Sequence, residues 1–407
     1  MQTVDTARMR EHNSALLLNL LFRQQNLSRA DLSRVTGLSR STVSAIVDDL
    51  IAADLVHELG TGDSRGGRRP TLLQFHDDAY AMVGVEMGAS HIRAVVTDLR
   101  ARVRGNRQAR HAVREDAAGA MALVGELIDG ALADAGARRS DLLGIGLGVP
   151  CPLDLRNPDQ LCHQLMPAWD GVAVTRIIAE RFGCPVAMDN DANLGALAER
   201  WWGAGVGGED LTYIKIATGV GAGHIIAGEV YRGSNGTAGE IGHIAIDLRG
   251  PECRCGLRGC LAALVGAQPL ADRVRALLSE DRTSALAAVE PTVHGLVAAA
   301  VAGDRLANQI VGEAGAHLGI EVASLLNLLN PAIVVLGGPL TAAGDRLLDP
   351  IRDTVRHRSL WRSVAEARIV TSQLGDAAVA VGAATLVLKA ALDAPARFSS
   401  PRLARAG

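Results

Sequence analysis

Lysine, long apolar runs and excess charge are all scarce in this sequence of 407 residues. The longest strongly apolar run, Ala377–Leu388, is shorter than the roughly 20 residues that cross a bilayer, and the N-terminus lacks the apolar segment of a secretory signal. We therefore expect a cytoplasmic protein with no membrane partner. The net charge of −3 excludes a polycation, and among the 41 basic residues only Lys215 and Lys389 are lysines. The positions of the arginines are therefore more informative than their number.

Cysteine is scarce as well, and six cysteines in a chain expected to be cytoplasmic are poor evidence for disulfides. Three of them, Cys253, Cys255 and Cys260, nevertheless stand within eight residues, which suggests a metal site. The length exceeds the usual ~100–200 residues per domain, so two or three domains are expected. A hydrophobic fraction of 48% is enough for a sizeable core and argues against disorder along most of the chain.

Residues 1–60 predict three helices. The first, Arg8–Gln24, carries an apolar block. Serines can cap the second and third helices, over Arg29–Thr36 and Arg40–Ala52, and a glycine can end the second. The third helix has an apolar stripe at helical spacing and a polar opposite face. Two short helices joined by a glycine-containing turn match the helix-turn-helix pattern.

A glycine-rich arginine loop follows the third helix. The stretch GTGDSRGGRRPTLLQF predicts a flexible hairpin between two short strands, that is, a wing, and such a loop suits minor-groove insertion and phosphate contact. The alternative is a small helical subdomain whose polar face is merely solvated. We favour DNA binding, with contacts expected from Ser39, Arg40, Ser41, Thr42 and Ser44 on the third helix and from Arg65, Arg68 and Arg69 on the loop.

From about Asp77 the pattern changes to alternating strands and helices. An apolar strand, a glycine turn and a second strand occur at Met82–Leu99 and again at Leu211–Tyr231. This recurrence indicates two related lobes that each open with a hairpin. A long helix, Glu313–Leu329, then leads into another apolar strand, whereas the tail after Asp393 lacks periodicity and is expected to be frayed.

The clearest chemical motif is a histidine followed by three cysteines with the spacing H-x9-C-x-C-x4-C: His243, Cys253, Cys255 and Cys260. Three thiolates and one imidazole satisfy tetrahedral zinc and leave no open position, which is the arrangement of a structural site. Glycines in CRCGLRGC let the backbone wrap tightly around an ion. The alternative, scattered buried cysteines beside a chance histidine, is weaker. The motif therefore predicts zinc as a cofactor.

Together these motifs resemble the ROK family, which contains bacterial sugar kinases and the winged-helix repressors derived from them. The family's zinc signature is present as EIGHIAIDLRGPECRCGLRGC, its active-site signature as DNDAN, and its nucleotide-side motifs, with changes, as VEMGAS, ATGVGAG, VVLGGPL and LGDAA. The head of the repressor branch is present as LSRADLSRVTGLSRSTVSAIVDDL followed by GGRRPTLLQF. The resemblance spans nearly the whole chain.

This resemblance implies an α/β protein: an N-terminal winged helix-turn-helix domain followed by a two-lobed, actin-like (ribonuclease H-like) body of the sugar-kinase type. The expected divisions are a DNA-binding domain at 1–76, a first lobe at 77–200, a second lobe with the zinc site at 201–393 and a flexible tail at 394–407. The C-terminal helix of the second lobe is expected to return to the first. Because members of the family usually assemble as dimers or tetramers, the resemblance also implies a homodimer or homotetramer.

The resemblance further implies a sugar pocket built from Asn190, Asp191, Glu240 and His243. In the family kinases the aspartate at the position of Asp191 is the general base, so Asp191 is a vestigial base candidate here. His243 would bind zinc through one nitrogen and present the other to the sugar. Asparagine and glutamate side chains can read vicinal hydroxyls. The alternative for Asn190 and Asp191 is a helix N-cap.

Two positions depart from the kinase pattern. Ala262 stands where the kinases have a glutamate that accepts hydrogen bonds from the sugar, and its loss leaves room for a larger ligand. Glu86 stands where they have an aspartate in the first phosphate hairpin, whose turn here also lacks the usual second glycine. An extra methylene would misplace magnesium or its waters, and phosphoryl transfer depends on positioning. The second phosphate loop, Gly219–Gly223, is intact.

We therefore expect a DNA-binding transcriptional regulator, a repressor, of sugar or carbon metabolism. Its partners would be a double-stranded DNA operator and a sugar or sugar derivative sensed in the kinase-derived cleft, without phosphotransferase activity. One alternative is an active ATP-dependent sugar kinase with a regulatory DNA-binding head. Another is a DNA-binding protein whose pocket has degenerated.

Overall fold

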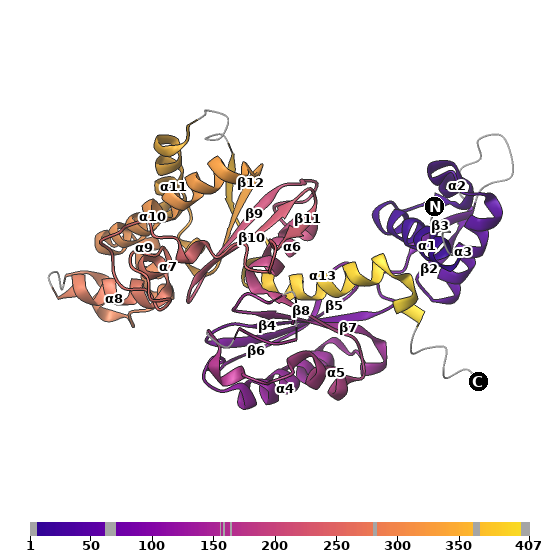
Figure 1. Ribbon diagram of the computed structural model, residues 1–407, viewed down its shortest axis with the longest axis horizontal. Coiled ribbons are helices and arrows are strands. Elements are labelled where there is room, and N and C mark those ends of the chain that lie inside the picture. Colours follow the sequence, from indigo (N-terminus) through magenta and orange to yellow (C-terminus); the bar gives the residue numbers. More distant parts are fainter. Residues whose placement is uncertain are drawn as a thin grey trace.

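Three β-sheets divide the chain, and Figure 1 shows them in a row, with the N-terminal head at one end and the C-terminal helix running toward it. The computed structural model describes residues 6–61, 71–154, 156–157, 159–162, 165–279, 283–360 and 367–399. The head contains α1 (Thr6–Arg23), α2 (Arg29–Thr36), α3 (Arg40–Ala52), β1 (Leu27–Ser28), β2 (Val56–Thr61) and β3 (Thr71–Phe75), with strand order β1-β3-β2.

The capping residues of α2 and α3 explain where these helices begin and end. Ser28 and Asp31 form a reciprocal capping box at the start of α2, and Gly37 ends this helix in the left-handed conformation at φ 71°. The Ser39 side chain accepts a hydrogen bond from the backbone of Thr42 and so caps α3. The predicted second and third helices are confirmed. The predicted wing residues Arg65, Arg68 and Arg69 lie outside the described residues.

Two five-stranded sheets follow, and they have the same topology. The first contains β4 (Ala81–Met87), β5 (His91–Thr97), β6 (Val103–Arg110), β7 (Leu142–Val149) and β8 (Val186–Asn190). The second contains β9 (Leu211–Ile216), β10 (Val220–Ile226), β11 (Glu229–Tyr231), β12 (Ile333–Gly337) and β13 (Arg368–Thr371). Their strand orders are β6-β5-β4-β7-β8 and β11-β10-β9-β12-β13. Each sheet joins an antiparallel meander to two parallel strands, so the predicted pair of related lobes is confirmed.

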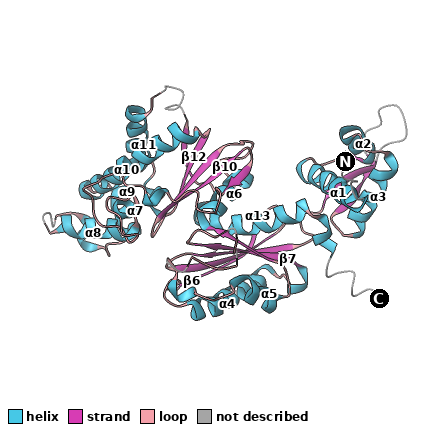
Figure 2. Cartoon of the chain, in the orientation of Figure 1, coloured by secondary structure: helices cyan, strands magenta, loops and turns pink. Residues whose placement is uncertain are grey.

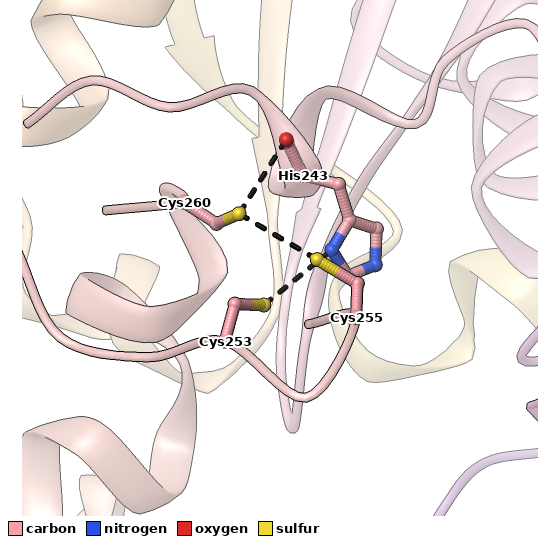
Figure 3. Close-up of side chains that lie close together, drawn as sticks. All are labelled: His243, Cys253, Cys255 and Cys260. Carbon is pink, nitrogen blue, oxygen red and sulfur yellow. Dashed lines mark hydrogen bonds between the residues drawn. The ribbon is translucent and has the colours of Figure 1, made fainter. Parts of the chain in front are cut away.

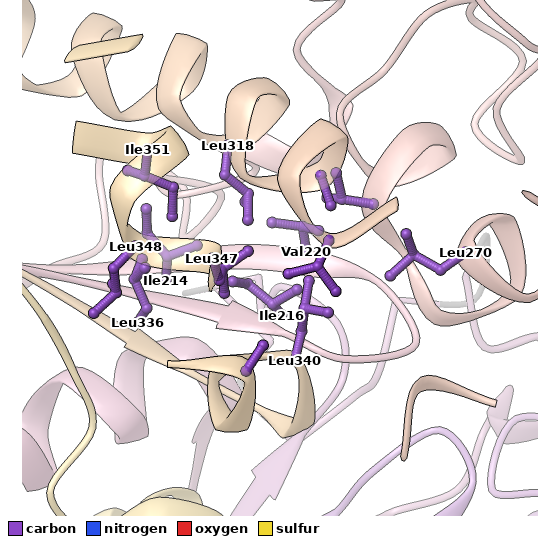
Figure 4. Close-up of a cluster of buried hydrophobic side chains, with 14 of the residues drawn as sticks. Ile214, Ile216, Val220, Leu270, Leu318, Leu336, Leu340, Leu347, Leu348 and Ile351 are labelled. Carbon is purple, nitrogen blue, oxygen red and sulfur yellow. The ribbon is translucent and has the colours of Figure 1, made fainter. Parts of the chain in front are cut away.

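Helices cover both sheets (Figure 2). Those around the first sheet are α4 (Ala117–Ala135) and α5 (Val174–Phe182). Those around the second are α7 (Ala262–Val265), α8 (Ala267–Leu278), α9 (Val293–Val301), α10 (Arg305–Leu329) and α11 (Asp345–Arg358). The helix predicted at Glu313 begins earlier, because Asp304 caps α10 through a hydrogen bond from the backbone of Ala307. Figure 4 shows the apolar core that this layer forms with the second sheet, including Ile214, Leu318 and Ile351.

Two helices, α6 (Asp191–Trp202) and α13 (Ala378–Asp393), lie where the sheets meet. Small residues allow their close packing: a methyl group at Gly84 or Gly146 would overlap carbonyl oxygens of α13, and one at Gly382 would overlap the backbone of α6. The segment Gly375–Asp393 is long and apolar enough to cross a membrane, contrary to the sequence estimate. It is nevertheless a core helix, since its most apolar window is 67% buried inside the protein.

The buried core of the head is continuous with that of the body. Leu17, Leu21 and Phe22 of α1 belong to a buried cluster that also contains Leu388 and Leu392 of α13. A hydrogen bond of 3.2 Å joins Asn19 Nδ2 to the carbonyl oxygen of Leu392 within this contact region. The head is therefore packed directly against the C-terminal helix.

Glu321 on α10 is a buried carboxyl group whose Oε2 has no hydrogen-bond partner among the described residues. Burial raises its pKa from 4.5 to about 7. The unfolded chain therefore releases this proton at lower pH than the native protein, and native stability falls as the pH rises from 4.5 through 7. Between pH 5 and pH 8 we expect the unfolding free energy of wild type to fall by up to about 3 kcal/mol relative to that of Glu321→Gln, as measured by urea unfolding. A difference in unfolding free energy between the two proteins that does not change with pH would contradict this expectation.

Candidate functional site

The predicted metal ligands converge from two segments of the second lobe (Figure 3). One donor atom from each of His243, Cys253, Cys255 and Cys260 lies within 4.8 Å of all the others. The Cys255 and Cys260 sulfurs are 3.7 Å apart, and the Cys253 sulfur is 3.5 Å from His243 Nδ1. A tetrahedral zinc with bonds of about 2.3 Å to sulfur and 2.0–2.1 Å to nitrogen requires almost the same separations. The cluster therefore fits a metal ion, and its chemistry suits zinc.

The backbone around the cysteines explains this convergence. The backbone N–H of Cys253 donates to Leu257, and that of Gly256 donates to Cys253, so the chain forms a tight turn. Gly259 has a φ of 69°, and a side chain there would overlap the carbonyl oxygen of Asp247. Glycine is therefore required where the two segments cross. The ring of His243 uses Nδ1 toward the sulfurs, which leaves Nε2 for a second contact.

Asn190 and Asp191 lie at the junction of β8 and α6, as predicted. The Asn190 side chain accepts hydrogen bonds from the backbone of Ala192 and Asn193, so it caps the helix. Its Nδ2 also donates to the carbonyl oxygen of Cys151, at 3.2 Å. The N-cap alternative thus describes what Asn190 does in this structure. A sugar contact of Asn190 stays a prediction.

Glu240 stands just before the short helical turn that carries His243. Burial and the nearby charge of Asp191 raise the pKa of the Glu240 carboxyl. The structure therefore brings Asp191 and Glu240 near one another. Ala262 is the first residue of α7 and contributes only a methyl group there.

Lys215 lies between the two lobes and was not among the site residues predicted from the sequence. Its ammonium is 2.6 Å from Glu86 Oε1 and 2.8 Å from Asp191 Oδ2, and its side chain is 12% exposed. Burial alone would raise the pKa of Glu86, but the charge of Lys215 and the contact with His91 outweigh this effect and lower it to about 2. Burial alone would lower the pKa of Lys215, but the two carboxylates raise it far above its ordinary value. A lysine inside the apolar strand LTYIKI was the available signal, because buried lysines need partners.

A second charged contact crosses the cleft. Arg232, which follows β11, donates from Nε to Asp189 Oδ2 at 3.0 Å, and Asp189 also accepts from Asn193. Arg232 belongs to the second lobe and Asp189 to the last strand of the first. A cavity of about 410 Å³ lies between the loop after β7 and the loop before Glu240. Asp154, Asn157, Asn235 and Thr237 provide polar groups in its wall.

The start of α3 presents the predicted DNA contacts. Ser39, Arg40 and Ser41 are exposed, and the Ser39 hydroxyl lies 2.8 Å from the hydroxyls of Ser41 and Thr42. Ser44 is half-buried, and its carbonyl oxygen accepts from Arg29. Arg40 forms no ion pair with the residues that the structure describes. Its guanidinium is therefore available to a phosphate or a base edge.

Comparisons with known proteins cover both parts of the chain. The ROK family model matches residues 82–390, more than half of the chain, and a MarR family model matches residues 12–69. The chain belongs to the ROK family. A relative named xylose repressor, from Caldicellulosiruptor bescii, is 32% identical over 391 residues that cover 95% of this chain and 98% of the relative. The winged-helix head and the kinase-type ROK body predicted from sequence are thereby confirmed.

Solved ROK structures agree with this assignment. A ROK family transcriptional regulator described as a homologue of the E. coli MLC protein has a TM-score of 0.81 and 26% identity, covering 96% of this chain and 99% of its own. A ROK family glucokinase from Streptomyces griseus, solved with glucose and AMPPNP, has a TM-score of 0.68 and 28% identity, covering 75% of this chain and 98% of its own. This ROK chain thus matches a regulator over nearly its full length and a kinase over three quarters.

Proposed function

We propose that this chain is a DNA-binding transcriptional repressor of sugar metabolism whose cleft binds a sugar or sugar derivative. The observation that carries the proposal is the exposed polar start of α3 in a winged-helix head joined to a ROK body. Relatives that match both parts are named repressors. A repressor of this kind acts in the cytoplasm on chromosomal operators. Residues 1–76, 77–200 and 201–393 would be its three domains.

The effector would bind at the junction of the lobes, beside Asp191, Glu240 and Nε2 of His243. Support comes from the proximity of the two carboxyl groups. Ala262 leaves room for a substituted or larger sugar. We assign zinc to the His243–Cys260 cluster as a structural ion that holds the loop bearing Glu240. Its contribution would be rigidity, because four protein donors leave no position for a substrate.

We further propose that the body has no phosphotransferase activity. Glu86 replaces the kinase aspartate and is already engaged by Lys215 and His91. Phosphoryl transfer depends on exact placement of metal and phosphate, and a carboxylate held in an ion pair does not provide it. Two-fold operators are read by paired heads, so a homodimer or a dimer of dimers is the expected assembly.

Replacing Arg40 tests the DNA-binding proposal. We expect Arg40→Ala to weaken operator binding by about 10-fold or more if the guanidinium reads a base, or to lower the salt slope by about one if it neutralises a phosphate. Binding is measured by fluorescence anisotropy on a site found by genome-wide footprinting. Arg176→Ala, which changes another exposed arginine, on α5, is the control. Deleting the head is less informative, because it would expose apolar residues of α13. Unchanged affinity and salt slope in Arg40→Ala would refute the assignment of α3.

A further inference from the structure

Lys215 stands at the centre of the motifs that would hold a metal-bound nucleotide in a kinase-type cleft. On one side of β9 it pairs in register with Gly221 of the glycine loop, and on the other with Gly337 of VVLGG. Its side chain extends to Glu86 on β4 and to Asp191 at the start of α6. Lys215 therefore joins the two lobes through a single nitrogen.

The two carboxylates require a cation between them. Their side chains are only 4% and 14% exposed, and each accepts a hydrogen bond from the same ammonium. Two buried carboxylates that face the same point would repel one another without a positive charge between them. Each is also costly to bury without a partner. Two carboxylates from different elements that face a single point are also a typical donor set for a divalent cation.

The lysine leaves no space for such an ion. Magnesium needs oxygen ligands at about 2.0–2.1 Å, whereas Nζ already lies 2.6 and 2.8 Å from the same two oxygens. An ion bound to these oxygens would overlap the ammonium and be repelled by its charge. The His91 ring lies against Gly88, where even an added methyl group would contact it, and its Nε2 is 3.6 Å from Glu86 Oε2. The His91 ring therefore covers the turn between β4 and β5, where the kinases have their first phosphate hairpin.

We propose that the Lys215 ammonium is a built-in cation of this cleft, occupying the place between Glu86 and Asp191 that a divalent cation would need. The inference rests on the proposed function and adds a ligand class to it: the cleft takes a sugar or sugar derivative alone, without metal and without metal-bound nucleotide. It also links the lobes before any ligand arrives, since Lys215 and Glu86 belong to different sheets. Lys215 is thus a positioning residue, which fixes the carboxylate of Asp191 by an ion pair.

Binding of Mn²⁺ alone tests this proposal, because Mn²⁺ prefers oxygen ligands and is visible by electron paramagnetic resonance. The proteins compared are zinc-loaded wild type, Lys215→Ala, Lys215→Arg and Lys215→Ala/Glu86→Gln. We expect Lys215→Ala to bind one Mn²⁺ at least about ten-fold more tightly than wild type, because the ammonium no longer occupies and repels the site. Lys215→Arg, which keeps the charge, and the double variant, which lacks one carboxylate, should behave like wild type.

The proposal would be overturned if wild type bound one Mn²⁺ and the Glu86→Gln variant did not. The ion would then occupy the site while the lysine is still present. A folded Lys215→Ala that binds no Mn²⁺ would overturn it as well. If Lys215→Ala is too unstable for titration, its melting temperature is measured with and without Mn²⁺. The ion should raise that temperature in Lys215→Ala and not in wild type, and no rise would count against the proposal. The Mn²⁺ measurements contain no DNA and no sugar. A negative result in them is therefore distinct from a negative result in operator binding, which is measured on the same wild-type preparation.

Discussion

Cys255→Ser is expected to release the metal from the His243–Cys260 cluster and to cost about 3–5 kcal/mol of unfolding free energy. Structural zinc supplies roughly 10–16 kcal/mol of apparent binding energy in isolated zinc-finger peptides, and only part of this applies here because the rest of the lobe has its own core. Cys255 is exposed, so serine fits without creating a buried cavity, and the loss of stability reports the loss of the ion. Zinc content by elemental analysis and urea unfolding measure the two effects.

Cys184→Ser is the matched control, since Cys184 is a half-buried cysteine of the first lobe that belongs to no cluster of metal-binding side chains in the described residues. It should keep one zinc per chain. Washed wild-type protein without stoichiometric zinc would contradict the assignment. Full stability of a zinc-free Cys255→Ser would show instead that the ion contributes little to the fold.

The second large effect concerns the response of the protein to its effector. In wild type we expect a saturating sugar ligand to lower operator affinity by roughly 5–150-fold, the range that corresponds to coupling of about 1–3 kcal/mol. Asp191→Ala should keep most of the DNA affinity of the ligand-free protein and lose this response, because the residue lies in the cleft and far from α3. Glu240→Gln, which leaves the Lys215 ion pair intact, should lose it as well. Anisotropy titrations with and without effector measure both quantities.

Asp170→Ala, an exposed change on the first lobe, should respond like wild type. An equal ligand response in wild type and Asp191→Ala would place the effector site elsewhere. The ligand can shift operator affinity only by as much as it prefers one lobe arrangement to the other. A protein with a degenerate pocket would show no response in any of these variants.

A continuous set of contacts connects the cleft with the head. Helix α6 begins at Asp191 and ends with Trp201 and Trp202, whose rings lie 6.1 and 6.3 Å from the ring of Phe22 on α1. Trp202 also donates from its indole nitrogen to Thr385 on α13 at 2.8 Å. A movement of α6 caused by ligand at its N-terminus would therefore reach the helix on which the DNA-binding head rests.

Local signals in the sequence predicted the elements that depend on local chemistry. Serine caps and a glycine stop located α2 and α3, and the repeated strand–glycine–strand pattern indicated the two lobes. The H-x9-C-x-C-x4-C spacing identified a cluster that the structure brings together. In each case the determining residues are close in the chain.

Features that depend on distant residues were not predictable in the same way. Lys215 looked like an ordinary strand residue, because its partners are 129 and 24 positions away. The shared core of α1 and α13 left no pattern beyond the amphipathicity of each helix. Asn190 caps α6, which is the alternative that the sequence also offered, and its sugar contact stays a prediction. Tertiary contacts, which propensity and spacing do not record, decided these cases.

The packing of α1 on α13 has a consequence for biosynthesis. Asn19 and Leu392 are hydrogen-bonded although 373 positions separate them, so this part of α1 meets its partner only after α13 has been translated. Nascent chains with exposed apolar surface are substrates for chaperones and prone to aggregate. A chain that ends before α13 would leave α1 without the cover that Leu388 and Leu392 provide, so we expect it to be less soluble than a chain that includes this helix.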